Sequence, residues 1–364
     1  MLSPNTSNQA TINGTNLSSS STSTFKIPTI DFSLWKDDNP EARLRVAQEL
    51  VSACKDVGFV YIINHGLAET LLEEAFDWSK KLFSLSHEDK MKAPHPEGWA
   101  VHRGYSWPGL EKVSQEKTRG EGSGNGDEEL VKKLREVVDC KESFDIGSEN
   151  NPDQPNQWIP DEVIPGFRNF MNAFYWKCFK VGGEILRAIA LGLGLDNDED
   201  YILKKHSGHN NQIRLLHYPP VPAEELESQR MARCPAHTDW STITMLFQDD
   251  CGGLEVEDIT NPGTFVSATP VKNAIIMNVG DLLQMWSNDS LRSTNHRVAL
   301  PPLSDRLEGP NRMTRERYSI PYFLSPDPTS LIECIPACMS EQNPAKYEPI
   351  TQADYNRMRA SVQY

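Results

Sequence analysis

Two short motifs, far apart in the chain, carry residue types that can bind one metal ion. His237-Thr238-Asp239 offers an imidazole and a carboxylate two positions apart, and His296 follows after 56 intervening residues. A strand places residues i and i+2 on the same face, so His237 and Asp239 can reach one ion together. Two imidazoles and one carboxylate leave the opposite side of the ion open, which suits non-haem Fe(II) binding a co-substrate and O₂. His296 must then come from a strand adjacent in space.

A third motif, Arg317-Tyr318-Ser319, suits a carboxylate. Alternation in a strand puts Arg317, Ser319 and Phe323 on one face, and a guanidinium beside a hydroxyl forms a fork for a carboxylate. The alternatives are an edge strand with a surface ion pair, and a His-x-Asp that occurs by chance in a structural strand. Together the motifs favour a metal with a clamp for an acidic co-substrate beside it.

The segment 212–218 is predicted to be a strand in which Arg214, Leu216 and Tyr218 share a face. One interpretation is a half-polar strand without a functional role. The other is that Tyr218 assists in binding the carboxylate while Arg214 faces a substrate. The remaining histidines nearby are interpreted as structural or surface residues, namely His206, His209 and His217.

The elements around these motifs indicate a mixed α/β chain that is mainly β. Helices are predicted from Pro40 to just before Gly58, over 68–84 and over 164–194, from their apolar stripes. Short strands separated by turn signals are predicted at 25–32, 59–63, 141–147, 212–218, 241–247, 253–257, 264–268, 274–279 and 317–324. This order favours a double-stranded β-helix, or jelly roll, with flanking support helices.

Four segments are predicted along the chain. Residues 1–24 are rich in Ser, Thr and Asn and contain no charged side chain, which is typical of a disordered tail. An N-terminal region of helices and strands over 25–195, a jelly-roll core over 196–342 and a C-terminal helix over 343–364 follow. The irregular region 91–126 and the Gly- and Glu-rich residues 120–129 are interpreted as a lid or insertion.

Composition excludes several classes of function. The formal net charge is −15, which argues against nucleic acid as a partner. The seven cysteines are odd in number and form no Cys-x-x-Cys, so we expect reduced thiols in an intracellular protein. No apolar run is long enough to span a membrane, and no signal or transit peptide is recognisable, so the expected compartment is the cytoplasm.

With these motifs in this order, the chain resembles the 2-oxoglutarate- and Fe(II)-dependent dioxygenases of the isopenicillin-N-synthase-like superfamily. The resemblance covers about 25–340, and within the superfamily it is closest to the fungal thymine dioxygenase-like enzymes. The motifs that carry the resemblance to the superfamily include 27–32, 58–66, His217-Tyr218-Pro219, Gly280-Asp281, His296-Arg297-Val298 and Arg317-Tyr318-Ser319. The similarity to the thymine dioxygenase-like enzymes is carried by 103–106, 111–115, 141–144, 214–219 and 246–249.

The resemblance implies roles for individual residues. His237, Asp239 and His296 match the iron ligands, and Arg317, Ser319 and Tyr218 match the residues that bind 2-oxoglutarate. The substrate pocket is expected to be lined by Arg214, Leu216, Trp240 and Phe323. Trp240 stands where the thymine-type enzymes carry Tyr, and 303–315 is longer than usual, so thymine itself is less well supported than the chemistry.

The expected activity is hydroxylation of a small cyclic, N-heterocyclic metabolite, with Fe(II) as the metal, 2-oxoglutarate and O₂ as co-substrates, and ascorbate as a useful reductant in vitro. The alternatives are a tailoring oxygenase of fungal secondary metabolism that takes a larger substrate, or an oxidase of the isopenicillin N synthase type that uses no keto acid. A catalytically silent jelly-roll binding protein is the least favoured, because no ligand is lost. Oligomeric state and the oxidised position stay open.

Overall fold

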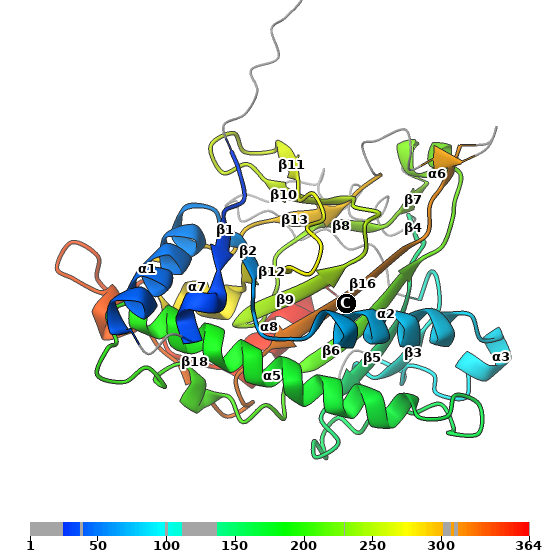
Figure 1. Cartoon of the computed structure of the whole chain (residues 1–364), viewed down its shortest axis with the longest axis horizontal. Helices are drawn as coiled ribbons and strands as arrows, with labels where there is room; N and C mark the ends of the chain where they lie inside the picture. The colour runs from blue at the N-terminus through cyan, green and yellow to red at the C-terminus, as the bar shows by residue number, and fades with distance from the viewer. Residues whose placement is uncertain are drawn as a thin grey trace, which may run out of the picture.

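The computed structural model describes residues 25–36, 39–98, 101–110, 137–228, 230–300, 307–308 and 312–363. The predicted tail at 1–24, the motif at 111–115 and the Gly- and Glu-rich residues 120–129 lie outside them. Two β-sheets face each other and several helices cover the outer side of the larger sheet (Figure 1). The predicted mixed architecture with a jelly-roll core and support helices is confirmed.

The larger sheet has eight strands in the order β1-β2-β12-β9-β16-β6-β5-β3. All neighbours are antiparallel except β1 and β2. Its strands are β1 (Thr29–Asp31), β2 (Phe59–Ile63), β3 (Gly104–Ser106), β5 (Glu142–Gly147), β6 (Gln212–Tyr218), β9 (Ile243–Gln248), β12 (Ile275–Val279) and β16 (Arg317–Leu324).

The smaller sheet has four antiparallel strands in the order β11-β10-β13-β8, and it lies at the top in Figure 1. Its strands are β8 (Cys234–His237), β10 (Leu254–Glu257), β11 (Phe265–Ser267) and β13 (His296–Val298). His237 is paired with His296 in this sheet. The expectation that a distant strand brings His296 beside His237 is therefore confirmed. The remaining short strands are β4 (Val138–Asp139), β7 (Met231–Ala232), β14 (Leu307–Glu308), β15 (Met313–Thr314), β17 (Leu331–Ile332) and β18 (Ile350–Thr351).

Alternation along the strands gives the larger sheet two different faces. The outer face packs against helices, as the buried Ile320 and Tyr322 of β16 do with Phe174 of α5 (Phe167–Gly192) in the main core. The inner face packs against the smaller sheet, with Phe59 and Ile276 meeting residues of β10 in a second apolar cluster. Polar residues of the inner face are therefore enclosed between two sheets.

The helices surround this pair of sheets. The N-cap Asn39 accepts from the backbone of Glu41, so α1 begins at Pro40, as predicted. The α-helices are α1 (Pro40–Asp56), α2 (Glu69–Phe83), α3 (His87–Lys90), α5, α6 (Ala223–Glu227), α7 (Asp281–Trp286) and α8 (Gln352–Gln363), with 3-10 helices η1 (Phe32–Lys36), η2 (Leu203–Lys205) and η4 (Pro336–Cys338). Among the described residues, no helix is both long and apolar enough to cross a membrane.

Two predicted elements are shorter than expected. The helix predicted over 343–364 begins only at Gln352, because Pro344 and Pro349 are incompatible with a helix interior and Ile350–Thr351 pairs with β17 instead. The strand predicted over 25–32 is reduced to β1 and runs directly into η1. The apolar pattern of that segment correctly indicates burial, but not one continuous element.

His206 is a buried structural histidine, as its interpretation from the sequence required. Its ring nitrogens lie 2.9 Å from the Ile202 carbonyl oxygen and 2.8 Å from the Thr242 hydroxyl. Burial lowers the pKa of His206 from 6.5 to about 4. Between these two pH values the unfolded chain binds a proton that the folded chain excludes, so stability is complete above about pH 6.5 and falls as the pH decreases towards 4.

We therefore expect acidification to lower the free energy of unfolding by up to about 3 kcal/mol through this one side chain. Urea unfolding of the wild type and of His206→Gln at about pH 7 and about pH 5 measures this decrease in the free energy of unfolding. Only the wild type should show the part of the decrease that is due to His206. His87→Gln is the matched control, because His87 is exposed. An identical pH dependence in wild type and His206→Gln would contradict the assignment.

Candidate active site

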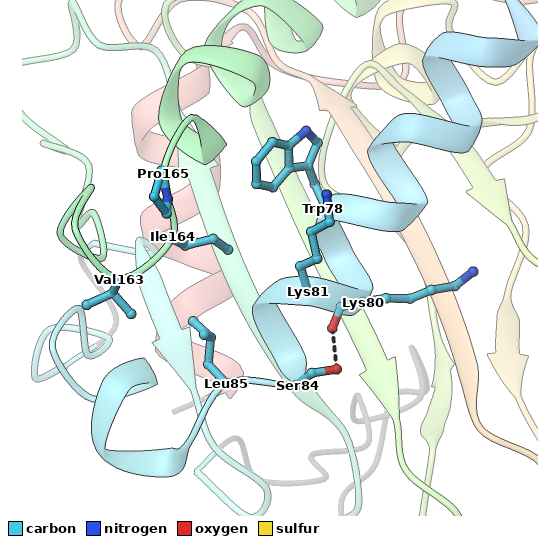
Figure 2. A pocket seen from close by; sticks show the side chains of 8 residues that line it. All are labelled: Trp78, Lys80, Lys81, Ser84, Leu85, Val163, Ile164 and Pro165. Atoms are coloured by element: carbon cyan, nitrogen blue, oxygen red, sulfur yellow. Dashed lines mark hydrogen bonds between the residues drawn. The ribbon is translucent and has the colours of Figure 1, made fainter.

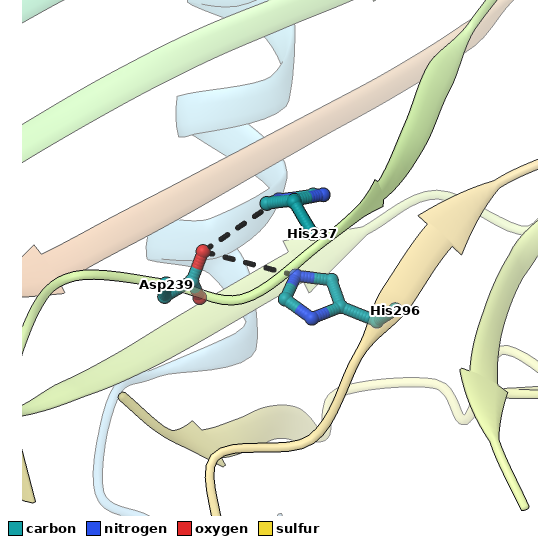
Figure 3. Close-up of side chains that lie close together, drawn as sticks. All are labelled: His237, Asp239 and His296. Atoms are coloured by element: carbon teal, nitrogen blue, oxygen red, sulfur yellow. Dashed lines mark ion pairs between the residues drawn. The ribbon is translucent and has the colours of Figure 1, made fainter. Parts of the chain in front are cut away.

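Three potential metal ligands converge between the two sheets (Figure 3). Nε2 of His237 and Nε2 of His296 each lie 3.7 Å from Oδ1 of Asp239, and one ligand atom from each residue falls within 4.8 Å of the other two. β8 ends at His237, so Asp239 lies just beyond the strand rather than on it. The three side chains nevertheless point towards one another, as their spacing predicted.

Backbone carbonyls orient both imidazoles. Nδ1 of His237 lies 2.9 Å from the Pro235 carbonyl oxygen, and Nδ1 of His296 lies 3.2 Å from that of Thr294. Each Nδ1–H donates to its carbonyl, which leaves the lone pair of each Nε2 directed at the shared centre. Burial and the neighbouring His237 lower the pKa of His296 to about 4. The neutral imidazole is the form that binds a metal.

Asp239 is held by two side chains of the larger sheet. Its Oδ2 accepts from the Thr244 hydroxyl at 2.6 Å and from Nδ2 of Asn278 at 2.8 Å, so Oδ1 is left to face the histidines. Burial raises the pKa of Asp239, but His296, His237 and these hydrogen bonds together lower it below its ordinary value. The carboxylate is therefore ionised, and the set of two nitrogens and one oxygen fits a divalent metal such as Fe(II).

The hydrogen bond from Thr244 gives a test of this arrangement. Thr244→Val keeps the shape of the side chain but removes the donor to Oδ2. We expect a loss of Fe(II) affinity of about 10–100-fold, the usual effect of removing an outer partner of a metal ligand. Anaerobic Fe(II) titration of the two proteins measures it, with Thr260→Val as a control because Thr260 is exposed and its hydroxyl bonds Asp258 away from the centre. Equal affinities would show that Thr244 does not orient Asp239.

A buried polar row lies beside this centre on the inner face of β16 and β6. Arg317 is 1% exposed and donates from Nε to the Gly252 carbonyl, from Nη1 to the Ser319 hydroxyl at 2.9 Å, and from Nη2 to Gln248 at 3.2 Å. Register pairs Arg317 with Tyr218 and Ser319 with Leu216. The predicted neighbours of a carboxylate are thus brought together, and Gln248 joins them.

The ring of Tyr218 lies next to the guanidinium group of Arg317. Its ring centroid is 5.0 Å from the guanidinium carbon of Arg317, and the residue is 1% exposed. Burial raises the pKa of the Tyr218 hydroxyl well above its ordinary value. The hydroxyl is therefore protonated and can donate to a carboxylate at this end of the site.

Three of the residues predicted to contact substrate, Arg214, Leu216 and Phe323, lie on the same face of the larger sheet as Arg317, whereas Trp240 lies between β8 and β9. Nε of Arg214 donates to Oδ1 of Asp145 at 2.7 Å and Nη2 donates to Oδ2 at 3.1 Å, a bidentate pair. Asp145 is fully buried and also accepts from Gln212. Phe323 pairs with Gln212 and with Thr244 across the sheet. Arg214 is consequently a fixed, oriented group rather than a mobile one.

The C-terminal helix α8 contributes to the same region. Oδ2 of Asp281 accepts from the Tyr355 hydroxyl at 2.8 Å, from Nη1 of Arg359 at 2.6 Å and from the Thr238 hydroxyl at 3.2 Å, while Oδ1 accepts from Ser293. The guanidinium of Arg359 lies 5.4 Å from the Trp240 ring. One carboxylate thus connects α8 to the segments that precede Asp239 and His296.

Gly280 makes this connection possible. A Cβ at Gly280 would overlap the Ser241 carbonyl, so only glycine lets α7 start so close to the segment that follows Asp239. The motif Gly280-Asp281, a family feature in the sequence, therefore has a structural reason at each position.

Two hollows occur away from the three ligands. One, of about 680 Å³, lies between α2 and the loop that precedes α5 (Figure 2), and its lining offers lysines and apolar groups but no carboxylate or imidazole. The other, of about 310 Å³, lies beside α2 and β9. Neither contains the cluster of metal ligands, which lies between the two sheets.

Sequence reasoning missed several contributors to this centre. Thr244, Gln248 and Asn278 share the inner face through the alternation of β9 and β12 and the pairing of Thr244 with Asn278. Alternation within the predicted strand relates Thr244 to Gln248, but only the sheet register adds Asn278. Asp145, Asp281 and Arg359 act through contacts between distant segments, which no local pattern reports.

Family models match two segments of the chain. Residues 27–162 match the non-haem dioxygenase in morphine synthesis N-terminal model, and residues 209–326 match the 2OG-Fe(II) oxygenase superfamily. The second match contains the three ligands and both the Arg317 and Ser319 positions.

Individual proteins show the same relationship. The 2-oxoglutarate-Fe(II) type oxidoreductase ppzD of Metarhizium majus is 36% identical over 93% of this chain and 95% of its own. The proline hydroxylase buaE of Petromyces alliaceus is 37% identical over 93% and 100%. The crystal structure of the full-length thymine 7-hydroxylase of Neurospora crassa with alpha-KG and thymine is 35% identical, covers 93% of this chain and 97% of its own, and has a TM-score of 0.78. These relatives favour an enzyme that uses 2-oxoglutarate over an oxidase that uses no keto acid.

Proposed function

Because this chain belongs to the 2-oxoglutarate- and Fe(II)-dependent oxygenases, we propose that it hydroxylates a C–H bond of a small nitrogen-containing ring compound. Succinate and CO₂ are the co-products. The observation that carries the proposal is that one strand, β9, contacts two buried sites: its Thr244 donates to Asp239 of the His-Asp-His centre, and its Gln248 accepts from Arg317, which also donates to Ser319.

The roles of the chain's residues follow from their contacts. Nε2 of His237, Nε2 of His296 and Oδ1 of Asp239 hold the metal, while the carbonyls and side chains behind them keep these atoms in place. Bound Fe(II) with 2-oxoglutarate and O₂ supplies the oxidation, in which one oxygen atom becomes the substrate hydroxyl and the other converts the keto acid to succinate and CO₂.

The polar row fixes the direction of 2-oxoglutarate. Arg317 and Ser319 bind the distal carboxylate and the protonated Tyr218 hydroxyl assists, so the keto end is turned towards the metal. Burial of these groups excludes water and strengthens the charge-assisted bonds.

The substrate class is inferred from the side chains near the metal centre and from the relatives together. Trp240 and Phe323 offer flat apolar faces, which suit a planar or compact ring. Arg214, held by Asp145, with Leu216 beside it, offers an oriented polar edge for a ring carbonyl or a carboxylate. The names of two relatives refer to small nitrogen-containing rings, namely proline and thymine.

A tailoring oxygenase that acts on a larger fungal metabolite is the second candidate. The observation that favours it is the relationship to the fungal 2-oxoglutarate-dependent oxidoreductases ppzD and frbA, whose similarity extends over 93% of this chain. A ring that is part of a larger molecule would pack against the same aromatic side chains, Trp240 and Phe323.

The experiment is an anaerobic titration of the purified apoprotein with Fe(II) and 2-oxoglutarate, observing the weak visible band of the chelate. Thymine, uracil, a hydroxylated nicotinate and L-proline are then added separately. A band that shifts with one of these rings, followed by its hydroxylation in air, supports the proposal. A band indifferent to all four favours the larger substrate, and no band with iron bound would contradict the assignment of the 2-oxoglutarate site.

A further inference from the structure

One buried guanidinium near the 2-oxoglutarate site has no assigned role. Arg233 lies between β7 and β8, directly before the strand that carries His237, and it is 2% exposed. Its Nη2 donates to the Arg315 carbonyl at 3.1 Å. Its Nε and Nη1 are buried and have no hydrogen-bond partner among the described residues. An arginine in this state is costly, because a buried charge needs compensation and its donors need acceptors.

The position of Arg233 relates it to the carboxylate row. The guanidinium carbon of Arg233 lies 5.7 Å from the centroid of the Tyr218 ring, and that of Arg317 lies 5.0 Å from the same centroid. The carbonyl that holds Arg233 belongs to Arg315, two residues before Arg317 on the approach to β16. Two guanidinium groups therefore border one buried tyrosine at one end of the site.

One acidic side chain of this region, Asp139, is already shared with a lysine. Asp139 is 4% exposed and is paired with Lys141 through both the side chain and the backbone nitrogen of that residue. Burial raises the pKa of Cys140 to about 11. The charge of Asp139 raises this pKa further and the charge of Arg233 lowers it, so both groups lie near Cys140. Asp249 is a second, partly buried acid and interacts with Arg317. The three cations Lys141, Arg233 and Arg317 still exceed the two acids Asp139 and Asp249 by one positive charge, which is the environment of an anion.

We propose that Arg233 is a second guanidinium of the 2-oxoglutarate site, and that its unpartnered N–H groups serve the distal carboxylate beside Arg317 and Ser319. The inference rests on the proposed function, since it takes the ligand of that site as given. A carboxylate accepts up to about four hydrogen bonds, so one bond each from Arg317, Ser319 and Tyr218 leaves one acceptor position for Arg233. The ligand would also offset the repulsion between the two buried guanidinium groups.

The test compares two keto acids that differ only at the distal end. Full-length wild type, Arg233→Met and Arg233→Lys are loaded with Fe(II) under anaerobic conditions, and dissociation constants are measured for 2-oxoglutarate and for 2-oxopentanoate, which lacks the distal carboxylate. We expect Arg233→Met to raise the dissociation constant of 2-oxoglutarate about 10-fold or more and to leave that of 2-oxopentanoate unchanged. Arg233→Lys should show a smaller loss of the same selectivity.

Arg230→Met is the matched control, because Arg230 is exposed and paired with Glu225. Unchanged 2-oxoglutarate affinity in Arg233→Met, or an equal loss for both acids, would overturn the proposal and leave Arg233 a structural residue. If Arg233→Met does not fold, Arg233→Lys decides alone by whether its loss is selective. Absence of 2-oxoglutarate binding in the wild type would instead refute the proposed function, so the two failures are distinguishable.

Discussion

Replacement of His237 or of Asp239 by alanine is expected to abolish both Fe(II) binding and succinate formation. Each change removes one of three ligand atoms that lie within 4.8 Å of one another. Loss of an outer partner already costs about 10–100-fold in metal affinity, so loss of a ligand should cost more than about 100-fold. Asp239→Ala also leaves the Thr244 and Asn278 donors without their acceptor.

Fe(II) content after anaerobic loading and succinate release with 2-oxoglutarate measure the two effects separately. His87→Ala is the control for a general loss of stability, because His87 is exposed and outside the centre. Normal succinate formation in either ligand variant would remove the metal assignment altogether. Iron loss without succinate loss would show that the metal is not catalytic.

The second large effect is expected from Arg317→Lys. The guanidinium makes three hydrogen bonds that fix its plane, and an ammonium cannot reproduce this fork. We expect the KM for 2-oxoglutarate to rise about 10–100-fold, much more than the KM for the ring substrate, because charge-assisted bidentate bonds are among the strongest in proteins.

Initial rates at varied 2-oxoglutarate and at varied ring substrate give the two constants. Arg315→Lys is the neighbouring control, since its guanidinium pairs with Asp250 at the surface. Equal increases in both constants would mean that Arg317 contacts the ring substrate rather than the keto acid.

Most of the centre was predictable because its motifs obey local rules. The two-residue period of a strand relates Arg317 to Ser319, and the strand limits of β6 and β16 coincide with the prediction. The partnership of His237 with His296 required only that a sheet bring distant strands together. The sequence motif established which residue types meet, while the sheet register established how.

What could not be predicted depends on contacts between distant segments. Asp145 is unremarkable in its own strand, yet it determines the orientation of Arg214 from the neighbouring strand. Arg233 resembles an ordinary surface arginine until its burial and its unpartnered nitrogens are known. The late start of α8 also involves a contact with another segment, because Ile350–Thr351 pairs with β17 instead of continuing the helix.

The carboxylate of Asp281 has a consequence for how the enzyme assembles. It receives hydrogen bonds from α8 and from the segments next to Asp239 and His296, so these parts share one buried anion. We therefore expect metal binding and docking of the C-terminal helix to be linked equilibria, in which each stabilises the other. On this expectation, Tyr355 and Arg359 contribute to iron retention through Asp281, although neither residue is a metal ligand.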